Sequence, residues 1–461
     1  MTVEHILEML DRTHSGPVTP VKEWNSRVIP TKVSQKLKEH GLQGTFTPDN
    51  PINTDDALAD EFFKAGFELA VDIGLLCPDT ERVIKVTEEE IQNALRNAPS
   101  KLNLGQGNDK VVMKHRQMED EYPPLCVAPL GIVFSEDIWV PVMQGIVENR
   151  EIDIFQGGSL ATIFSHRVYG GTPTETLLGR YQAQLTREAL RRAGRPGMHT
   201  QAVISSTTEY GQLGGFGTVG GFDPTNSTAL VLLTGELQAA YESWHKVASA
   251  INCGAIYRVQ VPSIIGGYAG PAEGAILTQI AVMLLILTIF KAQYIGSSVY
   301  DIRHGGTCGR EGQWATSVIH QSTSRNTHIL RTSTGAQLAG PCTKMLLYES
   351  AIFMMNFAVS GAEGAHVCRS AGGKYTDYLT PLECKFCGEV LKMSAGMTRK
   401  QVNDIAKVLI PKYEDALLDP PKGKSVRECY DLKTLKPTQE WLDIYLDVKK
   451  KLISLGVPLE S

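Results

Sequence analysis

The stretch of sequence that decides the fold runs from residue 255 to residue 304. It begins with the short apolar run Ala255-Ile-Tyr-Arg-Val-Gln-Val261, passes through the almost wholly apolar segment 280–290, and ends with Val299-Tyr-Asp-Ile-Arg-His304. A short strand, a longer helix and a second short strand are typical of the repeating unit of a parallel sheet. We therefore expect an α/β protein.

The same alternation extends over most of the chain. Its helices have recognisable ends, such as the one that begins at Pro173 and ends before Gly194. Seven strands are predicted, at residues 125–128, 152–155, 201–206, 255–261, 299–304, 327–332 and 365–369. Seven strand–helix units suggest that an eighth is present, so we predict a (β/α)8 TIM barrel. The pattern does not locate the eighth strand, and a doubly wound open sheet would give much the same sequence.

Two segments flank the predicted barrel, which we place at residues 121–418. Residues 1–120 are charged and mixed, with a capping box at Thr87, and we expect them to cap the amino-terminal side of the barrel. Residues 419–461 form a C-terminal extension with an amphipathic helix at 438–455. Its apolar stripe would pack either on the barrel or on a neighbouring molecule.

Composition excludes several classes of partner. The formal net charge of −5 offers no basic field for nucleic acid. The nine scattered cysteines do not resemble a disulfide framework, and the first residues lack the pattern of a signal peptide. Segment 280–290 is too short to cross a bilayer and is expected to be a buried helix. These features predict a cytoplasmic protein with no membrane partner.

Two short motifs admit other functions. Gly215-Phe-Gly-Thr-Val-Gly220 matches the glycine pattern of dinucleotide sites and would suggest an NAD-binding oxidoreductase. It lies far from the preceding strand and is separated from the next helix by Asp223 and Pro224, so a loop over the barrel mouth is favoured. Cys384-Lys-Phe-Cys387 has redox or zinc spacing, but without a second pair it favours core packing, and no metal site is predicted.

Charged residues on one predicted strand suggest a site inside the barrel. In segment 299–304 the alternation puts Asp301 and Arg303 on one face, and Tyr300 and Ile302 on the other. Because the apolar face meets the helices, the two charges would point inward. A structural ion pair is the alternative, since buried charges are costly unless they are paired.

Polar residues on two other strands support the same interpretation. Arg258 and Gln260 share one face of their strand, and His328 shares a face with Thr332 and Thr334. Barrel enzymes build their sites from polar groups at the carboxyl ends of the strands. These residues are therefore candidates for the site.

Nearly the whole chain resembles the monomethylamine:corrinoid methyltransferases of methanogenic archaea. The likeness lies in an ordered series of short blocks: Phe63-Lys-Ala-Gly-Phe-Glu, Cys77-Pro-Asp-Thr, Thr87-Glu-Glu-Glu-Ile, Ala193-Gly-Arg-Pro-Gly-Met198, Gly266-Gly-Tyr-Ala-Gly270, Ile302-Arg303, Ala339-Gly-Pro-Cys-Thr343, Gly423-Lys424, Glu428-Cys-Tyr-Asp and Lys433-Thr. The resemblance implies a (β/α)8 barrel that assembles into homohexamers. It also implies methyl transfer to the corrinoid of a small partner protein, with no cofactor bound tightly by this chain.

The chain departs from that family at the positions that matter most. Archaeal members carry pyrrolysine shortly after the G-R-P-G-M block, where this chain has Gln201. The positions of two family carboxylates match Ala229 and Gln260, and those of a polar and aromatic pair match Thr334 and Ala336. These differences indicate a rebuilt pocket. Readthrough of an amber codon as glutamine would explain Gln201 alone, and the enzyme would then use monomethylamine itself.

The chemistry of the reaction restricts the substrate. Reduced corrinoid cobalt attacks a methyl carbon in line, so the protein must supply orientation and a good leaving group. Without the imine of pyrrolysine, the methyl donor must itself contain a group that leaves readily when the methyl carbon is attacked. A quaternary or otherwise methylated amine is the favoured donor, and a sulfonium compound or an aryl ether is an alternative. A non-catalytic binding protein is the alternative of another class.

Candidate residues follow from this hypothesis. Gln201 and Gln260 would line the pocket floor, and Asp301 would meet a cationic donor. Aromatic faces would meet the same cation, which gains about 0.5–2 kcal/mol over a desolvated ring; the candidates are Tyr257, Phe216 and Tyr268.

Basic residues suggest a different part of the donor. Arg258, Arg303 and His199 would bind a carboxylate on the same molecule, as in a betaine. His199 or His328 would act as a general acid if the donor were an ether.

Overall fold

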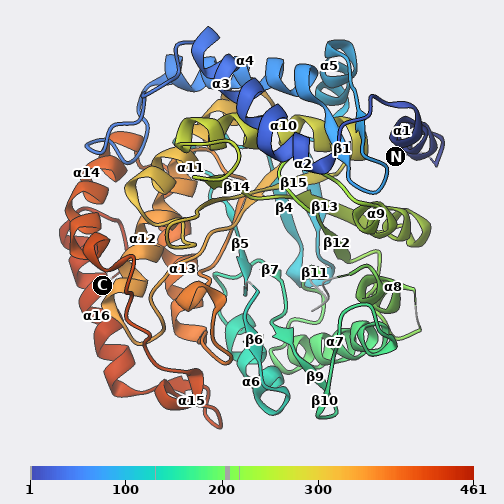
Figure 1. Ribbon diagram of the computed structural model, residues 1–461. Helices are drawn as coiled ribbons and strands as arrows, with labels where there is room; N and C mark the ends of the chain where they lie inside the picture. Colours follow the sequence, from blue (N-terminus) through green and yellow to red (C-terminus); the bar gives the residue numbers. More distant parts are fainter. Residues whose placement is uncertain (1–2, 130, 203–207, 218, 461) are drawn as a thin grey trace.

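The computed structural model describes residues 3–129, 131–202, 208–217 and 219–460, and at its centre is a closed barrel of eight parallel strands (Figure 1). Around the barrel the strands follow chain order: β5 (Leu125–Ala128), β7 (Ile154–Phe155), β11 (Thr200–Ala202), β12 (Ser227–Leu232), β13 (Ile256–Gln260), β15 (Tyr294–Ser297), β17 (Arg331–Ser333) and β18 (Gly364–His366). Strand β18 pairs with β5 and closes the barrel. The predicted (β/α)8 fold is confirmed.

A helix follows each strand and covers the outside of the barrel. In chain order these helices are α6 (Glu136–Val147), α7 (Pro173–Arg192), α8 (Tyr210–Phe216), α9 (Tyr241–Cys253), α10 (Ala272–Phe290), α11 (Arg310–Asn326), α12 (Lys344–Val359) and α13 (Pro381–Met393). Shorter paired strands lie outside the barrel: β1 (Leu75–Cys77) with β2 (Arg82–Ile84), β6 (Val133–Phe134) with β8 (Ser159–Leu160), β9 (Thr162–Ile163) with β10 (His166–Arg167), and β19 (Tyr430–Asp431) with β20 (Lys436–Pro437).

Six of the seven predicted strands overlap barrel strands, and one is wrong. Segment 299–304 contains β16 (Val299–Asp301), which pairs with β14 (Ser263–Ile265) outside the barrel. The barrel strand of this unit is β15, four residues after the end of α10. The strand that the sequence did not locate is β12, which begins with the polar pair Ser227-Thr228. Part of the predicted strand 201–206 lies outside the described residues.

A hairpin from the amino-terminal segment closes one end of the barrel. Strands β3 (Lys101–Leu104) and β4 (Val111–Lys114) bring Leu104 and Met113 against Leu125, Tyr294 and Leu330. Because these last three residues belong to the amino ends of the barrel strands or directly precede them, the hairpin fills the amino-terminal end with apolar side chains. In the described part of the chain the hairpin therefore closes the amino-terminal end of the interior.

The other amino-terminal helices pack on the side of the barrel. They are α1 (Val3–Ser15), α3 (Ile29–Glu39), α4 (Asp56–Ile73) and α5 (Glu88–Asn97), and Figure 1 shows them in blue around α10. The capping box predicted at Thr87 begins α5. These helices bury α10 completely, which confirms the expected buried helix. Within the described residues, α10 is the one helix long and apolar enough to span a membrane, and here it is a core element.

The carboxyl-terminal segment packs on its own barrel. Helix α16 (Gln439–Ser454) lies against α12, and its Trp441 donates a hydrogen bond of 3.0 Å to the hydroxyl of Thr380. Helix α14 (Arg399–Leu409) lies on the same side (Figure 1). The apolar stripe of α16 is thus used within the chain.

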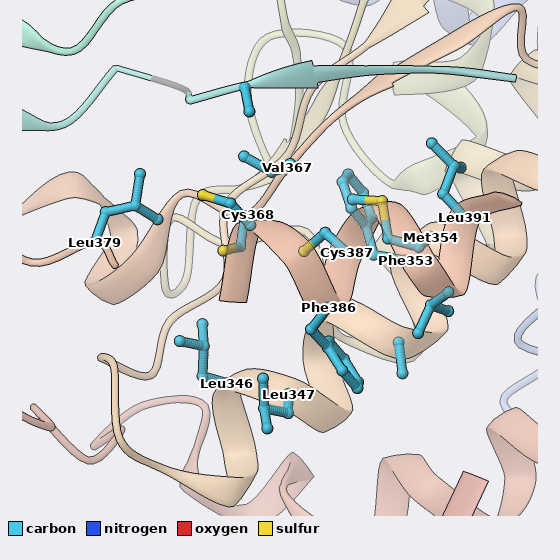
Figure 2. Close-up of a cluster of buried hydrophobic side chains, with 14 of the residues drawn as sticks. Leu346, Leu347, Phe353, Met354, Val367, Cys368, Leu379, Phe386, Cys387 and Leu391 are labelled. Atoms are coloured by element: carbon cyan, nitrogen blue, oxygen red, sulfur yellow. The ribbon is translucent and has the colours of Figure 1, made fainter. Parts of the chain in front are cut away.

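The cysteines of the C-x-x-C motif are part of the hydrophobic core. Cys384 and Cys387 lie on α13, and Figure 2 shows Cys387 beside Cys368 and Phe386. All nine cysteines have free thiols, and the described residues contain no cluster of three potential metal ligands. The motif therefore serves packing.

A buried ion pair joins two adjacent barrel strands. Arg331 of β17 and Glu363, which directly precedes β18, lie 3.0 Å apart and are both fully buried. The same guanidinium donates to the carbonyl of His320 on α11. The pair therefore links these two strands to helix α11, which precedes β17.

We expect Glu363→Gln to destabilise the protein by about 3–5 kcal/mol, because it leaves the buried guanidinium of Arg331 without a counter-charge. Thermal and urea unfolding, followed by circular dichroism, measure the change. The control is Glu188→Gln, which removes surface pairs with Arg191 and Arg192 and should leave the unfolding midpoint unchanged. Equal midpoints for the two variants would contradict the expectation.

Candidate active site in the barrel mouth

The carboxyl-terminal half of the barrel interior is polar. Strand β13 turns Arg258 and Gln260 inward, as predicted, and the neighbouring strand β15 faces them with Gly296. A side chain at Gly296 would overlap Gln260 and would place its Cβ 2.6 Å from Arg258 Nη2. The absence of a side chain at Gly296 therefore leaves the space that these two side chains occupy.

Gln201 lies across the interior in contact with a histidine. Its side-chain amide is 3.0 Å from Nε2 of His366 on β18, and Nδ1 of the same ring lies 3.0 Å from the carbonyl oxygen of Ser333. A carbonyl only accepts, so Nδ1 carries the hydrogen. Burial, helped by the charge of Arg258, holds the pKa of His366 well below its usual value. The ring is therefore neutral, and its Nε2 is an acceptor.

The neutral histidine determines the orientation of the Gln201 amide. Only the amide nitrogen can donate to Nε2 of His366, so the amide oxygen points away from the ring. The phenol of Tyr294 lies close to the amide, and burial raises the pKa of Tyr294 to about 12. The phenol therefore keeps its proton at neutral pH and is a donor beside the pocket.

His199 is also buried and neutral. Its Nε2 lies 2.8 Å from the hydroxyl of Thr228 on β12, and burial lowers the pKa of His199 to about 4. Near neutral pH this ring carries no charge. It therefore positions Thr228 and has no proton to give as a general acid.

Arg258 is a buried cation without an anionic partner. Its Nη2 donates to the carbonyl of Thr332 over 3.2 Å, and its Nε has no partner. Within the described part of the chain, no carboxylate forms an ion pair with it. Burial lowers the pKa of Arg258 to about 10, so the guanidinium remains charged at neutral pH. An unpaired buried charge is costly, which indicates that an anion completes this site.

Several other buried polar atoms in the interior lack a partner. Among the described residues they are Gln156 Oε1, Arg258 Nε, Gln260 Oε1 and Thr332 Oγ1. Buried polar groups are nearly always hydrogen-bonded in native proteins, so such a cluster indicates a bound polar ligand or water.

Some side chains at the carboxyl ends of the strands are partly exposed. Ala229 and Val231 of β12 are fully buried in the helix layer, so Thr228, Leu230 and Leu232 face inward. Leu232 is 44% exposed and Gln260 of the next strand is half-buried. Solvent therefore reaches this end. Ala229 itself faces the helix layer and does not line the pocket of this chain.

Two further positions from the sequence comparison lie after β17. Thr334 is buried, and its amide donates to the carbonyl of Ser297 at the end of β15. The carbonyl of Ala336 accepts a hydrogen bond from the amide of Thr307, and the amide of Ala336 donates to the Thr307 hydroxyl. Thr334 is thus at the level of the mouth, and Ala336 belongs to the loop that follows.

The aromatic candidates do not meet in the pocket. Tyr257 points toward the helices, where its hydroxyl donates to the carbonyl of Phe290 over 2.6 Å. Phe216 packs on Phe222 at the end of α8, with ring centroids 5.7 Å apart. Tyr268 is 51% exposed in the loop after β14. None of the three lies beside Gln201.

The predicted inward direction of Asp301 and Arg303 is wrong. Arg303 pairs with Asp301 and with Glu311 of α11, and its side chain is 60% exposed. Asp301 is the last residue of β16 and Arg303 follows it, both outside the barrel, because the barrel strand of this unit is β15. They form the structural ion pair that was the alternative.

Two other expectations fail for related reasons. His328 lies at the amino end of β17 and contacts the carbonyl of Ala98 at 3.0 Å, at the opposite end of the barrel from Gln201. The predicted mouth loop contains helix α8, where a side chain at Gly214 would overlap the carbonyl of Thr176 on α7. These glycines therefore allow two helices to approach closely, and the dinucleotide interpretation has no support.

Four residues of the pocket were not predicted from the sequence: Gln156, Thr228, Tyr294 and His366. His366 could have been found, because it lies in a predicted strand and alternates with Gly364 and Cys368. Tyr294 and Thr228 lie on the two strands that were not located.

Comparison with known proteins agrees with this architecture. The family model for monomethylamine methyltransferase MtmB matches residues 4–457. The MtmB protein of Methanosarcina mazei is 31% identical over 98% of this chain and 97% of its own length, and MtmB3 of Methanosarcina barkeri is 32% identical over the same shares.

Solved structures give the same result. The crystal structure of the Methanosarcina barkeri monomethylamine methyltransferase superposes with a TM-score of 0.93 at 30% identity, covering 98% of both chains. A structure of the hydroxylamine complex of MtmB matches equally well. The chain therefore belongs to the monomethylamine methyltransferase (MtmB) family and is a methyltransferase.

Proposed function

We propose that the protein moves a methyl group from a small quaternary or methylated amine to the Co(I) centre of a cognate corrinoid protein. The observation that carries the proposal is the cluster of unpartnered polar atoms near Gln201, at the carboxyl ends of the strands in a barrel of this family. The corrinoid belongs to the partner, and this chain binds no cofactor tightly. By resemblance the enzyme works in the cytoplasm as a homohexamer.

The protonation states of the pocket support a donor that leaves without a proton. His199 and His366 are neutral, and Tyr294 holds its proton tightly. The described pocket residues therefore offer no ready general acid near neutral pH. A quaternary ammonium needs none, because its nitrogen keeps the electron pair of the broken C–N bond and departs as a neutral amine.

Gln201 would then act by orientation. Its amide is held by His366 and has no electrophilic carbon of the kind that captures an amine. The other end of the amide lies toward the phenol of Tyr294, at the wall of the pocket. The residue would thus fix the angle of the methyl group toward the mouth.

We expect single-turnover methylation of the reduced corrinoid protein by a quaternary amine and none by monomethylamine. The appearance of methyl-Co(III) in the visible spectrum measures the transfer, and mass spectrometry of the peptide that contains residue 201 verifies glutamine. Rapid transfer from monomethylamine by glutamine-containing protein would contradict the proposal. Pyrrolysine at residue 201 would instead establish the amber-codon alternative.

The rate of that single turnover should not change with pH between about pH 6 and pH 9. The pKa of His199 is about 4, that of Arg258 about 10 and that of Tyr294 about 12, so none of these three groups titrates in the interval. A quaternary donor does not titrate either. Stopped-flow measurements with preformed Co(I) test this, and a sigmoid rise near neutral pH would reveal an acid or base in the reaction.

Gly296→Ala should lower kcat/KM at least tenfold, because the new methyl group overlaps Gln260 and crowds Arg258. The control is Gly309→Ala in the following loop, where the nearest atom to an added Cβ is 3.5 Å away. That variant should keep its activity. Equal activity of the two variants would show that Gln260 and Arg258 do not define the pocket.

A further inference from the structure

We propose that the methyl donor carries a carboxylate, which Arg258 binds at the bottom of the pocket. The inference rests on the proposed function and names its class of substrate: a short amino acid with a fully methylated nitrogen. It follows from the charge balance of the barrel interior, from the depth of Arg258 and from the kinds of polar atom that surround it.

The other large buried arginines of the protein are neutralised or saturated. Arg331 pairs with Glu363, and Arg195 pairs with Asp109. Arg116 donates to four backbone carbonyls and lies near Glu363. Arg258 has one carbonyl acceptor and no carboxylate. Among these buried arginines, Arg258 alone lacks an anionic partner or a full set of acceptors, and it faces the pocket.

The groups next to Arg258 are suited to a carboxylate. The guanidinium Nε and the Thr332 hydroxyl are buried and unpartnered, and the Tyr294 hydroxyl lies close to Thr228 and Gln201. Strand pairing places Tyr294 beside Arg258, and Thr332 accepts the one hydrogen bond of the guanidinium. A planar guanidinium and two hydroxyls are donors that bind the two oxygens of a carboxylate.

The atoms above Arg258 are suited to the cationic end of the same molecule. Gln260 lies two residues further along β13, toward the mouth, and its Oε1 is an unpartnered acceptor. Arg258 Nη2 and Gln260 both approach the space above Gly296, so the anionic and cationic ends of the ligand must be close together. This spacing favours a donor whose nitrogen and carboxylate are separated by one or two carbons.

Depth also determines which end faces the methyl acceptor. Arg258 is 1% exposed, whereas Gln260 is half-buried and Leu232 at the rim is 44% exposed. With the carboxylate held below, the methylated nitrogen points toward the open end. In the reaction the C–N bond breaks and its electron pair stays on nitrogen, while the electron pair of Co(I) forms the Co–C bond. No proton moves, and the product is the amino acid with one methyl group fewer.

The test compares donors that differ in the carboxylate alone. Glycine betaine has the carboxylate, choline replaces it with a hydroxymethyl group, and tetramethylammonium has neither. With the full chain and the reduced corrinoid protein, kcat/KM for glycine betaine should exceed that for choline at least a hundredfold. In Arg258→Gln the ratio should fall below tenfold. Equal rates for the three donors in the native protein would overturn the carboxylate inference and leave the proposed function intact.

A binding measurement separates failure of the inference from failure of the proposed function. Isothermal titration of glycine betaine into the protein alone should give a signal that acetate competes away and that Arg258→Gln abolishes. Binding without methyl transfer from any donor would sink the proposed function. If glycine betaine neither binds nor is demethylated, the inference that Arg258 binds a carboxylate of the donor is wrong.

Unfolding experiments guard against a variant that merely misfolds. Arg258→Met removes an unpaired buried charge, so its unfolding midpoint should equal or exceed that of the native protein. Glycine betaine should raise the midpoint of the native protein and of the matched control Arg303→Lys, but not that of Arg258→Met. A lower midpoint for Arg258→Met without ligand would show that Arg258 is a structural residue.

Discussion

Closure of the sheet into a barrel is the constraint on which the rest of the structure depends. A closed barrel has no edge, so each inward-facing side chain must either fill the interior or line a site. Here the two ends of the interior differ. The amino end is filled by apolar side chains of the strands and of the β3–β4 hairpin, whereas the carboxyl end holds amides, hydroxyls, neutral histidines and one guanidinium. The polarity of the interior thus changes along the strand axis.

The polar half is unusual in how little charge it contains. Relatives are named for monomethylamine, a small amine. In this chain the one charged pocket side chain described is Arg258, and burial keeps the two histidines neutral. A basic, otherwise uncharged pocket repels a simple ammonium ion and attracts a molecule that brings its own negative charge. The fold of the family is retained in this chain.

Much of the fold could be predicted from local pattern, since strands such as β5 and β13 are short apolar runs between helices with clear ends. Strands β12 and β15 were missed because the first begins with serine and threonine, and the second lies close behind α10 and contains Gly296. Because β15 was not located, segment 299–304 was taken for the barrel strand. Asp301 and Arg303 were therefore predicted to point inward, and Tyr294 was not recognised as a pocket residue. Alternation gave the direction of Arg258 correctly. No local pattern, however, shows that a guanidinium lacks a partner, because that depends on every residue around it.

The β3–β4 hairpin has a consequence for the order of events in a catalytic cycle. The hairpin closes the amino end of the barrel. Under the proposed function the corrinoid protein must therefore dock at the carboxyl ends of the strands to receive the methyl group. The methyl donor must bind before the corrinoid protein docks, and the demethylated product can leave only after the corrinoid protein has dissociated. The β3–β4 hairpin would in this way impose an ordered sequence of binding and release, although neither the donor nor the corrinoid protein contacts it.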